Sequence, residues 1–286
     1  MAHRPPKNLS LRQLVSGTFS LLAAKRCPLA LSILSFALLS AVVGVAVQQR
    51  IHSIEDDISA SAGLTWEQLH EHVDERLQIF TEADARQLIR QMFVRGALLN
   101  QEQNIPSRAA FDFMVRIGPW LLFSFALHTL ILFVSYVFFV LLAVAGSESP
   151  YDTVRRLPLM VLKMAGLWMW SMVRSLLWIP FLGPLIAIYM IPRVALGPAI
   201  LAGGRIGIVH SVRESMRRTR GRWVSIVLSL VVSCLLCISF LWFSMVIVAL
   251  LALFSTKVSF FVWLLLMFFL AAFQMFFLAT LAASME

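Results

Sequence analysis

Long uninterrupted apolar runs constrain the fold more than any other feature of this sequence. Residues 28–48, 119–145, 157–203 and 223–283 each meet or exceed the ~20 residues that a helix needs to cross a ~30 Å hydrocarbon core. The chain is 59% apolar and 14% charged, with a mean hydropathy of +0.83, whereas soluble domains are about half apolar and a quarter charged. These values predict an all-α, polytopic membrane helix bundle.

Proline, glycine and charged residues divide these runs into about six transmembrane helices. The predicted spans are 28–48, 119–145, 158–177, 179–203, 223–253 and 258–282. The Gly183-Pro184 pair, with Trp178 and Pro180 just before it, predicts a turn between the third and fourth spans. The last two spans are joined only by Ser255, Thr256 and Lys257, so we expect them to be antiparallel.

The distribution of charge predicts the orientation of the spans. The net charge is +9, but residues 50–116 contain eleven acidic against seven basic residues, so the rest of the chain carries +13. Basic residues near span ends mark the cytoplasmic side. They are dense before the first, third and fifth spans. We therefore expect a multi-pass protein of the bacterial inner membrane with both termini cytoplasmic, and the positional bias argues against a nucleic-acid partner.

Two amphipathic helices are predicted on the cytoplasmic side. In residues 1–27, Ser10 and Gln13 form a capping-box pattern, followed by apolar residues at helical spacing. Residues 204–222 contain six arginines and one glutamate, with a predicted apolar stripe of Ile208, Val209, Val212 and Met216. Helices of this kind lie in the membrane interface. Gly221 is the expected stop, and Trp223 the interfacial anchor of the next span.

A repeat of one amphipathic helix followed by a two-helix hairpin is consistent with this layout. A weak third copy begins at Ser149-Pro150-Tyr151-Asp152, where Pro158 is expected to end the helix early. The alternative is that interfacial helices simply precede spans. The sequence leaves the two interpretations open.

Residues 49–117 are predicted to form a helical extracytoplasmic insertion. Thr65 and Thr81 each begin a capped amphipathic helix, which predicts a helical hairpin. So short a segment has a small core, so its apolar faces are expected to pack on each other and on either the membrane-facing surface or a membrane-protein partner. His70 and Asp74 share a helix face, but the favoured interpretation is solvated surface, and no metal site is predicted.

Arg193 is the charged residue in an apolar run that most needs an explanation. Lys163 and Arg174 lie near span ends and can snorkel to the interface. Arg193 lies between Pro192 and Pro198, each of which releases a backbone carbonyl. Either Arg193 lies inside the membrane and binds an anionic lipid headgroup or anionic substrate, or the fourth span ends near Pro192 and Arg193 is interfacial.

No motif in the sequence predicts catalysis. The chain has no Walker, G-x-S-x-G or H-E-x-x-H pattern, so no enzyme, catalytic residue or cofactor is predicted. Cys234 and Cys237 lie deep in an apolar run and are expected to pack as small apolar residues. His128 and Gln274 are isolated polar residues in spans and are expected to form interhelical hydrogen bonds.

The run from Arg193 to Trp223 resembles the membrane domain found beside bacterial glycerophosphoryl diester phosphodiesterases and in related six-span inner-membrane proteins. The pattern is an Arg, a nearby Pro, and a Ser-x-x-x-Thr-x-Gly-x-aromatic motif that opens a span. The matching residues are Arg193, Pro198, Ser215, Thr219, Gly221 and Trp223. A glutamate common in the family is replaced by the Ala202-Gly203-Gly204 stretch, and the chain has no phosphodiesterase domain, so the resemblance implies only the membrane part.

These observations favour a non-enzymatic structural or accessory component of the envelope. Its expected ligand is anionic phospholipid, bound by Arg193, Arg213, Arg217, Arg220 and Arg222, because basic residues near a membrane attract anionic lipid at ~1 kcal/mol each. The first alternative is a small transporter or exporter subunit with an anion or lipid-headgroup site near Arg193 at a broken helix. A membrane enzyme is the second alternative, but it lacks the acid or histidine cluster that it would need.

Overall fold

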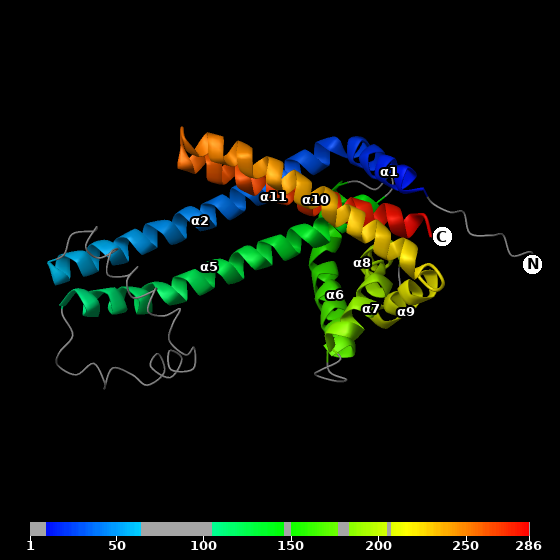
Figure 1. The fold of residues 1–286 in the computed structure, drawn as a ribbon, viewed down its shortest axis with the longest axis horizontal. Helices are drawn as coiled ribbons and strands as arrows, with labels where there is room; N and C mark the ends of the chain where they lie inside the picture. Colours follow the sequence, from blue (N-terminus) through cyan, green and yellow to red (C-terminus); the bar gives the residue numbers. More distant parts are fainter. Residues whose placement is uncertain (1–9, 64–104, 146–149, 177–182, 205–206, 286) are drawn as a thin grey trace, which may run out of the picture. The chain divides into compact units, whose positions relative to one another are not determined.

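The computed structural model describes residues 10–63, 105–145, 150–176, 183–204 and 207–285, and all regular secondary structure in these ranges is α-helical (Figure 1). The helices are α1 (Leu11–Ala24), α2 (Arg26–Ala62), α5 (Ile105–Val144), α6 (Pro150–Leu176), α7 (Gly183–Val194), α8 (Gly197–Gly203), α9 (Ile208–Arg218), α10 (Trp223–Ala252) and α11 (Thr256–Ala283). They form two compact units: Met1–Ala41 with Leu130–Glu286, and Val42–Thr129. The predicted all-α class is confirmed.

Within the described ranges, four helices are long and apolar enough to cross a membrane: α2, α5, α10 and α11. The exposed side chains of α10 support this assignment, because large apolar residues recur along one face. They include Val224, Leu228, Val231, Leu235 and Trp242. A stripe of this size on a soluble protein would be an aggregation hazard, whereas in a membrane it faces lipid.

The other two predicted spans correspond to α6 and to α7 with α8. Lys163 and Arg174 lower the hydropathy of α6, and α7 and α8 are 12 and 7 residues long. Pro158 lies inside α6, so the expectation that it ends a short helix there is wrong. Its position, two turns into α6, does not break the helix.

Helices α2 and α5 extend beyond the predicted span limits. The first continues past residue 48 to Ala62, and the second begins at Ile105 and runs through Pro119. The limits set at residues 49 and 117 therefore fall inside helices. Proline removes one helical hydrogen bond, which membrane helices often tolerate. The predicted hairpin from Thr65 and the His70–Asp74 group lie outside the described residues.

The second unit has a small apolar core of its own. Ile54, Ile58 and Phe113 are buried, and Ile51, Ile117 and Trp120 pack against them. Two polar contacts border this core: Arg116 Nη1 donates to Asp57 Oδ2 at 3.0 Å, and the Arg50 guanidinium lies 5.6 Å from the Trp120 ring centroid. Exposed ion pairs of this kind contribute little to stability, so the apolar contacts dominate.

An aromatic cluster forms the core of the first unit. The Phe36 ring of α2 lies 6.0 Å from the rings of Phe138 and Phe139 in α5, and 5.9 Å from the ring of Phe268 in α11. Phe139 and Phe268 are almost completely buried. Aromatic rings at this separation attract one another beyond the effect of burial alone, so this cluster joins three helices.

Helix α1 packs on α11 within the first unit. Ser10 forms the predicted capping box, in which its Oγ accepts from the Gln13 backbone and its own backbone N–H donates to the Gln13 side chain. Leu14 and Leu22 are buried, and a Cβ atom at Gly17 would come within 3.2 Å of Thr280 Cγ2. The apolar stripe of this amphipathic helix thus contacts protein.

Candidate functional site

The helical run around Arg193 is interrupted directly after that residue. Helix α7 ends at Val194 and α8 begins at Gly197, with Pro198 in its first turn. Proline favours this position because it has no N–H to leave unbonded there. Both interpretations of the sequence placed an interruption of the helix near Arg193. In the structure this interruption lies at Ala195 and Leu196.

Ser215 of α9 forms a hydrogen bond to the interrupted helical segment that contains Arg193. Its Oγ donates a hydrogen bond of 2.6 Å to the backbone carbonyl of Arg193. Ser215 is fully buried, so the bond satisfies a carbonyl near the break without exposing it to water. Arg193 and Ser215 are both residues of the motif quoted above, and here they are in direct contact.

The buried face of α9 differs from the predicted apolar stripe. Val212 is buried, Val209 is 44% exposed, and the other buried positions are Ser211, Ser215 and, in the following turn, Thr219. Small hydroxyl residues allow close helix packing in membrane proteins because they occupy little space and bond to backbone carbonyls. The face of α9 that packs on protein thus consists mainly of small hydroxyl residues, whereas the apolar stripe was predicted to lie in the membrane interface.

Two further residues of the motif, Thr219 and Gly221, lie in the turn from α9 to α10. The backbone N–H of Thr219 caps the end of α9 by donating to Ser215 O. Gly221 has a φ of 77°, a left-handed conformation that glycine adopts without steric cost. The predicted stop of the amphipathic helix is thus confirmed, and α10 begins two residues later at Trp223.

The Arg193 side chain is held by an aromatic ring and leaves one donor without a protein acceptor. Its guanidinium carbon lies 4.2 Å from the Tyr189 ring centroid, and the Tyr189 ring lies 6.4 Å from that of Trp223. Arg193 Nε and Trp223 Nε1 are both buried without a hydrogen-bond partner among the described residues. Both atoms are closed off from solvent, so a ligand reaches neither of them unless neighbouring side chains move.

Four arginines line one open cavity of about 490 Å³, named here the arginine cavity. Its lining residues are Arg193, Arg213, Met216, Arg217 and Arg220. The described lining includes no acidic residue. Four of the five predicted site residues thus come together, whereas Arg222 precedes α10 at its N-cap and does not line this cavity.

Glu214 forms ion pairs with two arginines of its own helix, α9. Its Oε1 accepts from Arg217 Nη2 at 2.8 Å and from Arg218 Nε at 2.9 Å. The hydrogen bond from Arg218, followed by that from Arg217, lowers the pKa of the Glu214 carboxyl below its ordinary value. The carboxylate therefore stays ionised at neutral pH, and Arg217 shares its charge with it.

The polar residues within the spans differ in their bonding. Gln274 of α11 hydrogen-bonds Cys237 of α10, so the expected interhelical bond is confirmed there. His128 instead donates from Nδ1 to the carbonyl of Ser124 in its own helix at 2.8 Å. Among the described residues, no group of three or more His, Cys, Asp or Glu side chains could hold a metal ion.

The spacing of Arg213 and Arg217 was the sequence signal for the site, because residues at i and i+4 share one side of a helix, whereas Arg220 lies in the turn after α9. The position of Arg193 opposite them depends on tertiary packing.

Comparison of the chain with family models, curated proteins and solved structures gives no match.

Proposed function

We propose that this chain is a multi-pass protein of the bacterial inner membrane that binds an anionic phospholipid headgroup in the arginine cavity. It acts without catalysis, as a structural or accessory component of the envelope. The observation that carries this proposal is the convergence of Arg193 with Arg213, Arg217 and Arg220 around a cavity whose described lining contains no acid. Guanidinium groups match phosphate oxygens in pairs.

The arrangement also supports a headgroup ligand over a free anion. The cavity lies between α7 and α9, directly before the first residues of the apolar helix α10. A lipid bound there would place its phosphate among the arginines and its chains beside the exposed apolar stripe of α10. The flexible side chain of Met216, which also lines the cavity, can contact the apolar part of the lipid beside its headgroup.

Replacing Arg213 and Arg220 with glutamine tests the lipid proposal. At ~1 kcal/mol per charge, the double substitution R213Q/R220Q should weaken binding of phosphatidylglycerol about 30-fold, with phosphatidylcholine binding unchanged. Native mass spectrometry of the purified full chain with each lipid measures this. The matched control is R12Q/R26Q, which removes two exposed arginines elsewhere and the same net charge.

An equal loss in both double variants would mean that the chain attracts anionic lipid only through its overall charge, which would contradict a site at the arginine cavity.

Anion transport is the second candidate function, favoured by the break between α7 and α8. Transporters bind anions at interrupted helices. Chloride or phosphate flux through liposomes that contain the wild-type chain, and its loss in R193Q, would favour transport over the accessory role.

The proposed topology has six spans, with α6 and the α7–α8 pair as the third and fourth, and both termini cytoplasmic. Reporter fusions test it directly. Alkaline phosphatase fused after residue 180 should be active, and green fluorescent protein fused after residue 286 should fluoresce, because basic residues keep their flanks cytoplasmic. Inactive phosphatase after residue 180 would leave only α2, α5, α10 and α11 as spans.

The extracytoplasmic residues 49–117 are proposed to contact a partner membrane protein. The small core of the second unit supports this, since the cluster of buried apolar side chains described in it consists of Ile54, Ile58 and Phe113. The predicted partner would add apolar contacts that the unit does not make for itself.

A further inference from the structure

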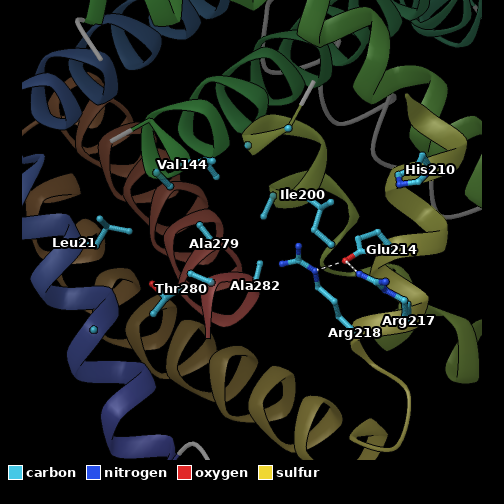
Figure 2. A pocket seen from close by; sticks show the side chains of 16 residues that line it. Leu21, Val144, Ile200, His210, Glu214, Arg217, Arg218, Ala279, Thr280 and Ala282 are labelled. Carbon is cyan, nitrogen blue, oxygen red and sulfur yellow. Dashed lines mark hydrogen bonds and ion pairs between the residues drawn. The ribbon is translucent and has the colours of Figure 1, made fainter. Parts of the chain in front are cut away.

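A second cavity lies within the first unit, on the side of α9 where Glu214 holds its two arginines. It is an open cavity of about 800 Å³, named here the interhelical cavity, and α1, α5, α8, α9 and α11 all contribute to it (Figure 2). This volume lies within the range of about 300–1,000 Å³ that is typical of small-molecule sites.

The two walls of the interhelical cavity differ in chemistry. One wall consists of small or apolar residues from four helices: Gly17, Leu21, Ala143, Val144, Ala199, Ile200, Gly203, Ala279, Ala282 and Ala283. The opposite wall is polar and comes from α9: His210, Glu214, Arg217 and Arg218. Figure 2 shows the ion-paired Glu214, Arg217 and Arg218 facing Ala279 and Ala282 across the space. The cavity is therefore amphipathic.

The apolar wall has little freedom to collapse into this space. A Cβ atom at Gly203 would come within 2.9 Å of Val144 Cγ1, and one at Gly17 within 3.2 Å of Thr280 Cγ2. At both glycines a side-chain methyl of the neighbouring helix thus lies against the glycine backbone, so the helices cannot move much closer together there.

The charged wall carries a net positive charge. Both arginines donate to the same oxygen, Glu214 Oε1, so one carboxylate faces two guanidinium groups. Glu214 accepts from Nη2 of Arg217 and from Nε of Arg218. This wall attracts a single anionic group and rejects a second cation.

The apolar wall is built from the ends of membrane-length helices. Ala143 and Val144 end α5, and Ala279 to Ala283 end α11. Both helices are apolar enough to cross a membrane, so their ends reach the level of lipid headgroups. An occupant there meets hydrocarbon on one side and charge on the other.

We infer that the interhelical cavity binds a single-chain anionic amphiphile, with its hydrocarbon chain against the alanine and glycine wall and its headgroup at Arg217 and Arg218. A fatty acid and a lysophospholipid share this chemistry. The interhelical cavity shares only Arg217 with the arginine cavity, and the inference does not rest on the proposed function.

Filling the cavity with one large side chain tests the inference. Ala283 is exposed and lines the cavity, so A283W can fill the space without disturbing buried packing. Binding of radiolabelled oleate to the full chain in lipid nanodiscs should weaken about tenfold or more in A283W. The matched control A252W places tryptophan at an exposed alanine at the end of α10, away from the cavity, and should bind oleate within about twofold of the wild type.

Two further arms define the ligand and separate the two sites. Oleyl alcohol should bind at least about tenfold more weakly than oleate, because it has no charge for the polar wall, and lysophosphatidate should compete if a phosphate headgroup also fits. Failure of lysophosphatidate to compete identifies the carboxylate as the headgroup. R213Q/R220Q should keep its oleate affinity while losing phosphatidylglycerol, so either site can fail its test alone.

Photo-crosslinking of the wild-type chain gives a readout that needs no variant. A fatty acid with a diazirine on its chain should label peptides that contain Leu21, Ala199 or Ala279, and the labelling should be blocked by excess oleate. Labelling confined to the outward face of α10, equal oleate binding by A283W, or equal binding of oleyl alcohol and oleate would each overturn the inference.

Discussion

Replacing Val212 with aspartate should lower the free energy of unfolding by about 3–5 kcal/mol, the cost of an uncompensated buried charge. Val212 has 0% exposure and lies on the face of α9 that packs against the protein. Because proteins are stable by only about 5–15 kcal/mol, the V212D chain should yield much less folded protein. Thermal unfolding in detergent, followed by fluorescence-detected size exclusion, measures the change.

The matched control for V212D is the same substitution at Val209, three residues earlier on the same helix. Val209 is 44% exposed, and exposed substitutions usually change stability by less than about 0.5 kcal/mol. The amphipathic stripe predicted from the sequence contains both valines, so the pair of substitutions separates the effect of burial against protein from that of position on the stripe. If V209D proved as harmful as V212D, the buried face described for α9 would be wrong.

Phe268 should be a sensitive aromatic position of α11. Truncation to alanine removes the ring that stacks on Phe36 at 5.9 Å and leaves a cavity where the side chain is 1% exposed. Such substitutions cost about 3–5 kcal/mol. We therefore expect F268A to lower the melting temperature in detergent by about 6–20 °C, because a larger chain loses about 2–4 °C per kcal/mol.

Phe260→Ala on the same helix is the control for F268A. Phe260 is 43% exposed, so its ring is already in contact with the surroundings and its removal opens no cavity. A melting temperature for F260A within a few degrees of the wild type is expected. Equal losses in the two variants would show that α11 is sensitive along its whole length and that the cluster around Phe36 has no special role.

The sequence predicted the apolar helices well because length and hydropathy depend only on local composition. The last two helices, α10 and α11, end within two residues of the predicted spans, and Ser10 caps α1 as its pattern indicated. These features need no knowledge of what each helix packs against. The extension of α2 to Ala62 was missed because polar residues such as Gln48 and Arg50 suggested a loop, although they are compatible with a helix outside a membrane.

The candidate site was only half predictable, for a physical reason. The arginines on α9 follow one another at helical spacing, so their common side could be inferred. Their approach to Arg193 depends on the hydrogen bond from Ser215 and on the break at Ala195 and Leu196. Ser211, Ser215 and Thr219 also recur four residues apart, and this spacing of small hydroxyl residues was the signal for the buried face that apolar periodicity missed.

Arg217 lines both the arginine cavity and the interhelical cavity. A residue that lines two sites couples them thermodynamically. An occupant of one site that draws the Arg217 guanidinium away from Glu214 changes the electrostatic potential at the other site. Linkage makes such coupling reciprocal, so each occupant changes the affinity of the second by the same factor. If both proposed ligands bind, the arginine cavity and the interhelical cavity on α9 would form one heterotropic system, linked through Arg217.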